Sequence, residues 1–435
     1  MSLSTQPYKG ARDFYPVDKR FQKWMFNKWR GVVERFGYEE YDAPILEPTE
    51  LYAAKTSEEV VTEQTYTFTD RGDRSVTIRT EMTPTVSRMI AAKRQELAYP
   101  VRWYSIPNFW RYERPQRGRL REFWQLNVDL FGVEGIEADF EAIQIADALM
   151  QKFKAKRDMY TIKVNSRRLV NYLLNEHFAL NDVQSETLIR LIDKMHKIEH
   201  SEFVAKVDAI LTPSQRESDL ANRILEILKI KTLKDLNTKL PAKELLGEIQ
   251  HLLDLCQQTH ISNIEFDITL MRGFDYYTGI VFEVFDNHPE NNRSMFGGGR
   301  YDGLVGLFGA EPVASVGFGM GDVTLQNFLE LHGLMPKLHS ETDLYVALIG
   351  DVFEKSQKIL SDLRGMAVNI AVDNTGRKID KQIKTAAKKG LHYVLFIGDK
   401  ELEEGQFKIK NLETGKEETH SLERIVTMIK DRRKK

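Results

Sequence analysis

The chain has 435 residues, of which 42% are apolar and 29% are charged, and its net charge is −2. This length exceeds what one hydrophobic core usually serves, so we expect about two to four domains with an ordinary soluble composition. No apolar run approaches the ~20 residues of a membrane helix, and the N-terminal residues contain no apolar signal region.

The lone cysteine and the near-neutral net charge further narrow the class of protein. Cys256 alone excludes a disulfide framework and a cysteine-based zinc site within one chain, and we expect it to be buried in a helix. A nucleic-acid partner would have to bind through local patches of Lys and Arg. These observations favour a cytoplasmic protein without a membrane partner.

Helix and strand patterns alternate through the first part of the chain. Residues 16–38 predict a helix that ends at Gly37, and residues 66–81 predict a hairpin with its turn at residues 70–73. Thr83 is a candidate N-cap, with Pro84 at the first helical position. Residues 166–258 then carry dense charge with helical periodicity, which indicates a helical insertion.

An arginine-rich segment spans residues 109–132. Five arginines, Arg111, Arg114, Arg117, Arg119 and Arg121, fall within eleven residues on a predicted strand–turn–strand. If Arg111 and Arg119 face the same side, they form a fork suited to phosphate oxygens. Phe123 could stack on a base, and Glu113 could accept a hydrogen bond from an exocyclic amine. A solvated, arginine-rich hairpin is an equally good interpretation of these residues alone.

Polar residues interrupt two segments with the pattern of buried strands. The segments are FDITL at residues 266–270 and IVFEVF at residues 280–285, both rich in β-branched and aromatic types. Between them lie Arg272, Asp275, Tyr276 and Tyr277. A guanidinium, a carboxylate and two phenols at this junction require an explanation beyond core packing.

Two glycine-rich segments follow, MFGGGRYDGL at residues 295–304 and SVGFGMGD at residues 315–322. Neither matches a phosphate-binding loop or a Rossmann fingerprint. They indicate that backbone approaches a strand or a ligand closely, and close strand packing is the favoured interpretation. Glu81 lies where a predicted strand enters a helix, where a capping carboxylate is the ordinary expectation.

Taken in order, these motifs resemble those of histidyl-tRNA synthetases, which are class II aminoacyl-tRNA synthetases. The RGFDYY stretch resembles the family's histidine-specific motif, and residues 111–125 resemble its second class motif. The resemblance implies an α+β catalytic core, an antiparallel sheet flanked by helices, at residues 1–165 and 259–332. It also implies a helical insertion at 166–258, a linker at 333–342 and a C-terminal α/β anticodon-binding domain at 343–435. The family forms homodimers, and the segment that contains Pro44 resembles the motif of the dimer contact.

The activity that the resemblance implies is ATP-dependent ligation of L-histidine to its tRNA through a histidyl-adenylate, releasing AMP and pyrophosphate. Arginines and the Mg²⁺ that comes with ATP stabilise the charge that develops on the phosphate oxygens. Arg272 and Arg111 match the catalytic arginines, and no metal ligand is assigned to the protein.

The resemblance also assigns binding residues. The positions that match the histidine site are Glu81, Thr83, Arg111, Gln125, Asp129, Arg272, Tyr276, Tyr277 and Tyr301. The positions that match the ATP site are Arg111, Glu113, Arg119 and Phe123. Imidazole needs a donor and an acceptor at fixed separation, so polar partners discriminate it well. Asp129 stands where many bacterial relatives carry Glu, which keeps the charge but shortens the reach. For Thr83 and Tyr301, capping and packing are equal alternatives.

Four positions match tRNA contacts. Gln116 and Arg117 match the turn that approaches the acceptor end. Lys378 and Lys381 belong to a basic stripe in the C-terminal module that suits phosphate contacts. A solvated helix face is the competing interpretation of that stripe.

One motif departs from the family. The third class motif usually ends in G-L-E-R, whereas the matching positions here are Gly321, Asp322, Val323 and Thr324. Thr324 supplies no cation, so we expect weaker ATP binding or compensation by another Arg or Lys. This departure supports an alternative, a non-catalytic paralogue such as the regulatory subunit of ATP phosphoribosyltransferase. The RGFDYY stretch and the C-terminal module argue against it, and RGFDYY also argues against a different ATP-dependent ligase on the same fold.

Overall fold

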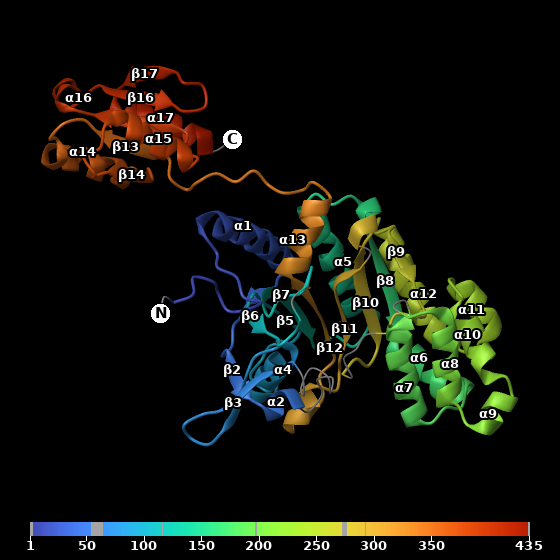
Figure 1. Cartoon of the computed structure of the whole chain (residues 1–435). Coiled ribbons are helices and arrows are strands. Elements are labelled where there is room, and N and C mark those ends of the chain that lie inside the picture. The colour runs from blue at the N-terminus through green and yellow to red at the C-terminus, as the bar shows by residue number, and fades with distance from the viewer. Residues whose placement is uncertain are drawn as a thin grey trace. The chain divides into compact units, whose positions relative to one another are not determined.

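The computed structural model describes residues 3–53, 64–114, 116–195, 198–271, 276–291 and 293–433. The chain divides into two compact units (Figure 1). The larger comprises Met1–Asp13 and Gln22–Met335, and the smaller comprises Phe14–Phe21 and Pro336–Lys435.

A nine-stranded sheet forms the centre of the larger unit in the described residues. Its order is β1 (Glu39–Glu40), β5 (Val101–Ser105), β7 (Glu122–Phe131), β12 (Ser315–Gly321), β11 (Ser294–Arg300), β10 (Ile280–Asp286), β8 (Tyr160–Ser166) and β9 (Ile264–Phe266), with β6 (Asn108–Trp110) paired to β7. The pairs β1–β5 and β8–β9 are parallel, and the central pairs are antiparallel. The predicted antiparallel core is therefore confirmed, with parallel pairs at its two ends.

Helices cover this sheet. α5 (Ile136–Lys152) packs on β10 and β12, and α13 (Asp322–Leu331) packs on β7, β11 and β12. α1 (Pro16–Val33) continues as a 3₁₀ turn to Phe36 and stops at Gly37, whose φ of 80° ends the helix as predicted. α4 (Thr83–Ala92) corrects one prediction: its N-cap is Met82, so Thr83 is the first helical residue and gives no cap.

A small sheet carries the predicted hairpin. Its order is β2 (Leu46–Pro48), β4 (Ser75–Ile78) and β3 (Tyr66–Thr69), and α2 (Glu50–Ala53) follows β2. The hairpin is confirmed because β3 pairs with β4 and the amide of Asp70 donates to the carbonyl of Arg74 at 2.9 Å.

Between β8 and β9, the described residues form helices. These are α6 (Arg167–Asn171), a π-helical turn (Tyr172–His177), α7 (Asp182–Asp193), α8 (His200–Ile210), α9 (Pro213–Glu217), α10 (Leu220–Leu228), α11 (Leu233–Lys239) and α12 (Lys243–Gln258). Cys256 is buried in α12 as predicted, and burial raises the pKa of its thiol to about 12.

The strand expected at residues 266–270 is wrong. β9 ends at Phe266, because the carboxylate of Asp267 accepts hydrogen bonds from the backbone amide and the hydroxyl of Thr269, at 3.0 and 2.6 Å. Such a local turn competes with strand pairing.

The smaller unit contains a five-stranded sheet in the order β14 (Ile370–Asp373), β13 (Leu344–Leu348), β15 (Tyr393–Ile397), β16 (Phe407–Asn411) and β17 (Glu417–His420). Its helices are α14 (Phe353–Gly365), α15 (Ile379–Lys388), α16 (Asp399–Glu404) and α17 (Leu422–Arg433). The first three strands are parallel, as the alternation of strand and helix predicts, and the hairpin β16–β17 was not predicted.

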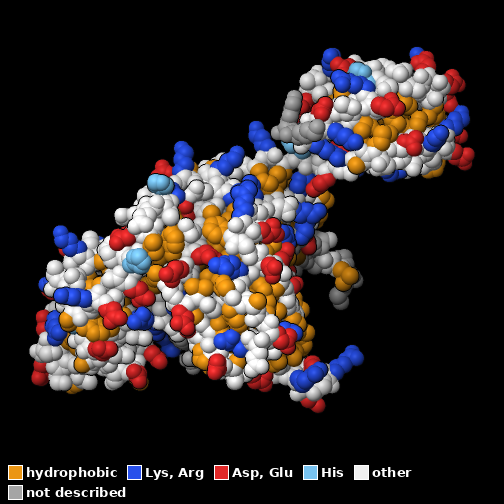
Figure 2. Space-filling model, turned by 180° about the vertical axis from the view of Figure 1, so that it is seen from behind, with side chains coloured by type: hydrophobic (Ala, Val, Ile, Leu, Met, Phe, Trp, Pro, Cys, Tyr) orange, Lys and Arg blue, Asp and Glu red, His pale blue; other side chains and the backbone are white. Residues whose placement is uncertain are grey.

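The surface carries both signs of charge. On the face seen in Figure 2, Lys and Arg side chains are interspersed with Asp and Glu over each unit. In the part of the chain that the structure describes, none of the helices combines the length and apolarity needed to cross a bilayer.

Candidate active site

Three neighbouring strands, β7, β12 and β11, form the floor of a pocket with a cavity volume of about 50 Å³. Successive side chains of a strand point to opposite faces, so Phe123, Gln125, Asn127 and Asp129 of β7 share one face. The pocket brings together seven predicted residues, which are Glu81, Thr83, Arg111, Gln125, Tyr276, Tyr277 and Tyr301.

Glycines make room for this pocket. Gly317 of β12 is opposite Asp129, and Gly319 is opposite Asn127. A Cβ atom on Gly317 would lie 2.3 Å from Oδ1 of Asp129, and one on Gly319 would lie 2.5 Å from Nε2 of Gln125. Both strand packing and a ligand pocket therefore depend on these glycines, so the two interpretations of the segment are compatible.

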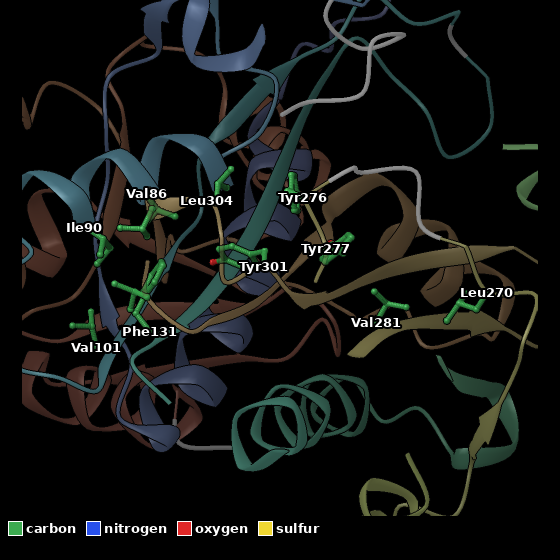
Figure 3. Close-up of a cluster of buried hydrophobic side chains, with 12 residues drawn as sticks. Val86, Ile90, Val101, Phe131, Leu270, Tyr276, Tyr277, Val281, Tyr301 and Leu304 are labelled. Carbon is green, nitrogen blue, oxygen red and sulfur yellow. The ribbon is translucent and has the colours of Figure 1, made fainter. Parts of the chain in front are cut away.

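Hydrogen bonds between side chains fix the polar wall. The hydroxyl of Tyr276 donates to Oε2 of Glu81 at 3.2 Å, and the hydroxyl of Tyr301 donates to Oδ1 of Asp129 at 2.5 Å. The ring of Tyr276 lies 4.9 Å from Tyr277 and 5.9 Å from Tyr301, measured between centroids. Figure 3 shows the three tyrosines within one cluster of buried side chains. These contacts hold the three phenols in fixed positions relative to Glu81 and Asp129.

Asp129 lies outside the lining of the pocket, behind Tyr301 and Gly317. The residue is 4% exposed, and its Oδ2 atom has no hydrogen-bond partner among the described residues. Burial raises the pKa of Asp129 to about 7, and the hydrogen bond from Tyr301 acts in the opposite direction. The same burial raises the pKa of the Tyr301 phenol well above its usual value. Near neutral pH this pair can hold or release one proton.

Arg111 joins the pocket to the arginine-rich hairpin, residues 111–121. Its Nε atom donates to the carbonyl of Thr80 at 3.0 Å, and its guanidinium carbon lies 5.4 Å from the ring centroid of Phe123. Glu113 and Arg119 form an ion pair at 3.5 Å, and the Arg119 side chain is 60% exposed. Arg111 thus lines the pocket, while Glu113, Arg119 and Phe123 lie on the adjoining hairpin and strand.

The tip of the hairpin is a tight turn beside α13. The backbones of Gln116 and Arg119 pair at 3.0 and 2.9 Å, and Arg117 lies 3.9 Å from Glu290. A Cβ atom on Gly118 would lie 3.8 Å from Cγ2 of Thr324. Thr324 donates to the carbonyl of Met295 at 3.0 Å, so its hydroxyl is used within the fold.

The remaining predicted residues lie elsewhere. Lys378 is the N-cap residue of α15 in the smaller unit, and Lys381 lies on that helix, both exposed. Arg272 and Asp275 lie outside the described residues. Among the residues that are described, no group of three or more His, Cys, Asp or Glu side chains is placed to hold a metal ion.

Five lining residues were not among the predicted ones, namely Asn127, Gly297, Gly317, Phe318 and Gly319. The two-residue period of β7 could have identified Asn127, because it lies between Gln125 and Asp129 on the same face. The glycines were recognised as points of close approach, but sequence alone did not show what they approach.

Comparisons with known proteins give a consistent result. A histidyl-tRNA synthetase family model matches residues 10–323, and an anticodon-binding-domain model matches residues 343–432. The histidine–tRNA ligase of Leptospira biflexa serovar Patoc is 40% identical over 433 residues, covering 99% of this chain and 98% of that protein. That of Haloarcula marismortui is 37% identical over 413 residues, 94% of each chain. The crystal structure of histidyl-tRNA synthetase from Nostoc sp. PCC 7120 shares the fold, with a TM-score of 0.81 at 21% identity, covering 99% of this chain and 100% of that one.

Proposed function

The chain belongs to the histidyl-tRNA synthetase family, a family of class II aminoacyl-tRNA synthetases that ligate histidine to tRNA, and from this premise we propose that its pocket binds histidine and aligns it with ATP. The observation that carries the proposal is the pocket itself, in which a polar tyrosine and glutamate wall meets Arg111. Full-length relatives that are histidine–tRNA ligases favour this activity over a regulatory paralogue or a different ligase.

The two ends of histidine would meet different walls. Glu81 is a buried carboxylate that suits the α-amino group, and Thr83 lies beside it. The phenols of Tyr276, Tyr277 and Tyr301 can donate to or accept from imidazole, with Gln125 on the other side. We propose that Asp129 acts through Tyr301, because it hydrogen-bonds this hydroxyl instead of lining the pocket.

The reaction needs a cation where the two substrates meet. A carboxylate oxygen of histidine attacks the α-phosphorus of ATP, the bond to pyrophosphate breaks, and histidyl-adenylate forms. We assign Arg111 to the α-phosphate, since its planar donors suit phosphate oxygens and it lies between the pocket and Phe123. Arg272 is assigned to the same charge by resemblance alone. Phe123, Glu113 and Arg119 would hold the adenine and the phosphate tail.

Mg²⁺ would enter as part of the ATP substrate. Mg²⁺ in such sites is commonly held by substrate phosphates with few protein carboxylates. Bound there, it would offset charge on the phosphate oxygens.

Transfer to tRNA would follow when a ribose hydroxyl of its terminal adenosine attacks the carbonyl of the adenylate and AMP leaves. We propose that Gln116 and Arg117 approach the acceptor end of the tRNA, and that residues 343–435 bind the anticodon, with Lys378 and Lys381 on phosphates. Residues 166–258 would be the helical insertion between the two parts of the core. The cytoplasm is the compartment that fits these substrates and the single buried thiol.

The partner in assembly would be a second copy of the chain. Ile45, Leu46 and Phe68 are 43%, 44% and 46% exposed on and beside the small sheet. Exposed apolar side chains suit a two-fold contact, and Ile45 and Leu46 directly follow Pro44 in the segment that resembles the dimer motif.

Histidine-dependent exchange between ATP and pyrophosphate tests the proposal. Wild type should exchange, and Arg111→Ala and Arg272→Ala should each lose about a hundredfold or more in rate. Arg102→Ala is the matched control, since Arg102 forms a two-bond ion pair with Glu141 at 2.9 Å outside the pocket. Folded wild-type protein that binds histidine without exchange would contradict the proposal and favour the regulatory paralogue.

A further inference from the structure

The N-terminal arm, residues 3–13, lies across the base of the arginine-rich hairpin. The carbonyl of Gly10 accepts the backbone amides of Arg121 and Glu122, at 2.9 and 3.2 Å. Gly10 has a φ of 85°, and a Cβ atom there would lie 2.7 Å from Cγ of Arg121. The arm is therefore seated at a point where only glycine fits.

Aromatic rings on the arm and on the hairpin pack around the Arg121 side chain. The guanidinium carbon of Arg121 lies 3.9 Å from the ring centroid of Tyr112 and 5.7 Å from that of Tyr8, and its Nη1 atom donates to the Tyr8 hydroxyl at 3.1 Å. Tyr8 also packs against Tyr66 and Trp110, with centroids 6.4 Å away in each case. The Arg121 side chain thus packs against Tyr8 of the arm and against Tyr112 of the hairpin.

Arg12 connects the same arm to α13. Its Nη2 atom lies 2.6 Å from Oδ2 of Asp322, whose side chain is 5% exposed. The other oxygen of Asp322 accepts the backbone amide of Trp124 at 3.0 Å. Strand pairing between β7 and β12 ends at Gln125 and Gly321, so the Asp322 side chain supplies the next hydrogen bond after the backbone ladder stops.

This arrangement depends on the charge of Asp322. Burial raises the pKa of its carboxyl, while Arg12 acts in the opposite direction. A buried carboxylate without its cation is costly, so loss of Arg12 would favour protonation or movement of Asp322. Either change would weaken the bond to Trp124, which directly follows Phe123 on β7.

Asp322 and Thr324 both occupy positions where the third class motif departs from G-L-E-R. In this chain both side chains make internal hydrogen bonds, and Thr324 offers no cation to ATP where the family has arginine. The nucleotide must then be held mainly by the hairpin and β7, which makes the position of these elements more important.

We propose that Arg12 is a positioning residue for ATP, acting through Asp322 to hold the start of β7, including Phe123, against α13 while the arm holds the base of the hairpin. The inference rests on the proposed ATP site. It concerns nucleotide binding, because Asp322 bonds the backbone of Trp124 next to Phe123, whereas the Glu81, Tyr276 and Tyr301 wall is joined by its own hydrogen bonds.

The test measures the KM for ATP and the KM for histidine separately in pyrophosphate exchange by the full-length chain. Arg12→Ala should raise the KM for ATP about tenfold, which corresponds to the loss of one charged hydrogen bond, and change the KM for histidine less than about twofold. Arg12→Lys, which keeps the cation, should recover most of the loss. Asp322→Leu should also raise the KM for ATP, and the double variant should be no worse than the poorer single one, because both act through the same bond.

Arg102→Ala is again the control, since the Arg102 and Glu141 side chains are 29% and 21% exposed, compared with 24% for Arg12. It should lower stability without a selective effect on ATP. Parallel rises in both KM values, full additivity of the double variant, or an Arg102→Ala effect equal to that of Arg12→Ala would overturn the proposal. Calorimetric titration with a non-hydrolysable ATP analogue compares the nucleotide affinities of the same variants without the exchange reaction. Failure of the inference is therefore distinguishable from failure of the proposed function.

Discussion

The histidine side of the site and the nucleotide side are built in different ways. Glu81, Tyr276 and Tyr301 are 4%, 6% and 2% exposed and are joined by hydrogen bonds to neighbouring side chains or by ring contacts. By contrast, the side chains of Arg117 and Arg119 on the hairpin are 52% and 60% exposed, and their ion pairs are 3.9 and 3.5 Å long. The histidine side is fixed by the packing of its side chains. The nucleotide side is fixed where the base of the hairpin contacts the N-terminal arm.

This difference indicates how sensitive each side of the site is to substitution. Walls that are held by packing and hydrogen bonds discriminate well because substrate binding reorganises them little, but a small intrusion into them is costly. Exposed arginines tolerate substitution better, since water can solvate what is left. Changes in the wall should therefore have larger and more selective effects than changes near the hairpin.

The largest effect should come from filling the pocket floor. Gly317→Ala would place a methyl group 2.3 Å from Oδ1 of Asp129, so we expect loss of about 1–3 kcal/mol of unfolding free energy and about a hundredfold loss of histidine-dependent exchange. Gly303→Ala is the control, because nothing lies within 4 Å of its Cβ position. Equal behaviour of the two variants in denaturant unfolding and exchange would contradict the description of the wall.

The next effect tests selectivity within the wall. Glu81→Gln keeps the shape but removes the charge that the α-amino group would pair with, so the KM for histidine should rise about tenfold to a hundredfold. The KM for ATP should stay within about twofold. A rise in the KM for ATP of the same size would mean that the two sides of the site are not separate in this way.

A pH-dependent effect on stability, separate from the effects on substrate binding, should arise from Asp129. Its folded-state pKa of about 7 lies above the ordinary 3.8, so the folded chain retains a proton that the unfolded chain releases. Stability from this group is therefore present at low pH and is lost as pH rises from about 4 through 7. Asp129→Asn should remove this pH-dependent loss of unfolding free energy, which amounts to up to roughly 4 kcal/mol. Urea unfolding at several pH values measures it, and parallel curves for the two proteins would refute the assignment.

The smallest effect is expected on the exposed side. Thr324→Arg restores a cation where the third class motif usually has one, so the KM for ATP should fall about threefold. Thr324→Gln supplies length without charge and should not lower it. An unchanged KM in Thr324→Arg would show that the hairpin and the arm already compensate for the missing arginine.

The resemblance to the family assigned Glu81, Gln125, Tyr276, Tyr277 and Tyr301 to one site, and the structure places all five around one pocket. The two-residue period of β7 places Gln125 and Asp129 on one face, and the confirmed hairpin follows from its turn residues at 70–73. The glycines of β12 marked a close approach, although their partners on β7 lie almost 190 positions earlier in the chain.

Other features could not be predicted, because they depend on side chains that compete with the backbone or on distant contacts. Asp267 ends β9 through a local turn that the apolar alternation of residues 266–270 conceals. Met82 takes the cap position although Thr83 has the more suitable side chain. The bond between Arg12 and Asp322 joins residues 310 positions apart, and no local pattern indicates it.

That separation also has a consequence for how the protein is made. Arg12 leaves the ribosome well before its partner Asp322, which is translated 310 residues later. Likewise, β7 cannot pair with β12 until residues 315–321 have emerged. Pairing over such distances is slow, and domains generally fold as units during synthesis. The nascent core therefore stays open at the edge of β7 that pairs with β12, and the ATP side of the site can close only when translation of the first unit is almost finished.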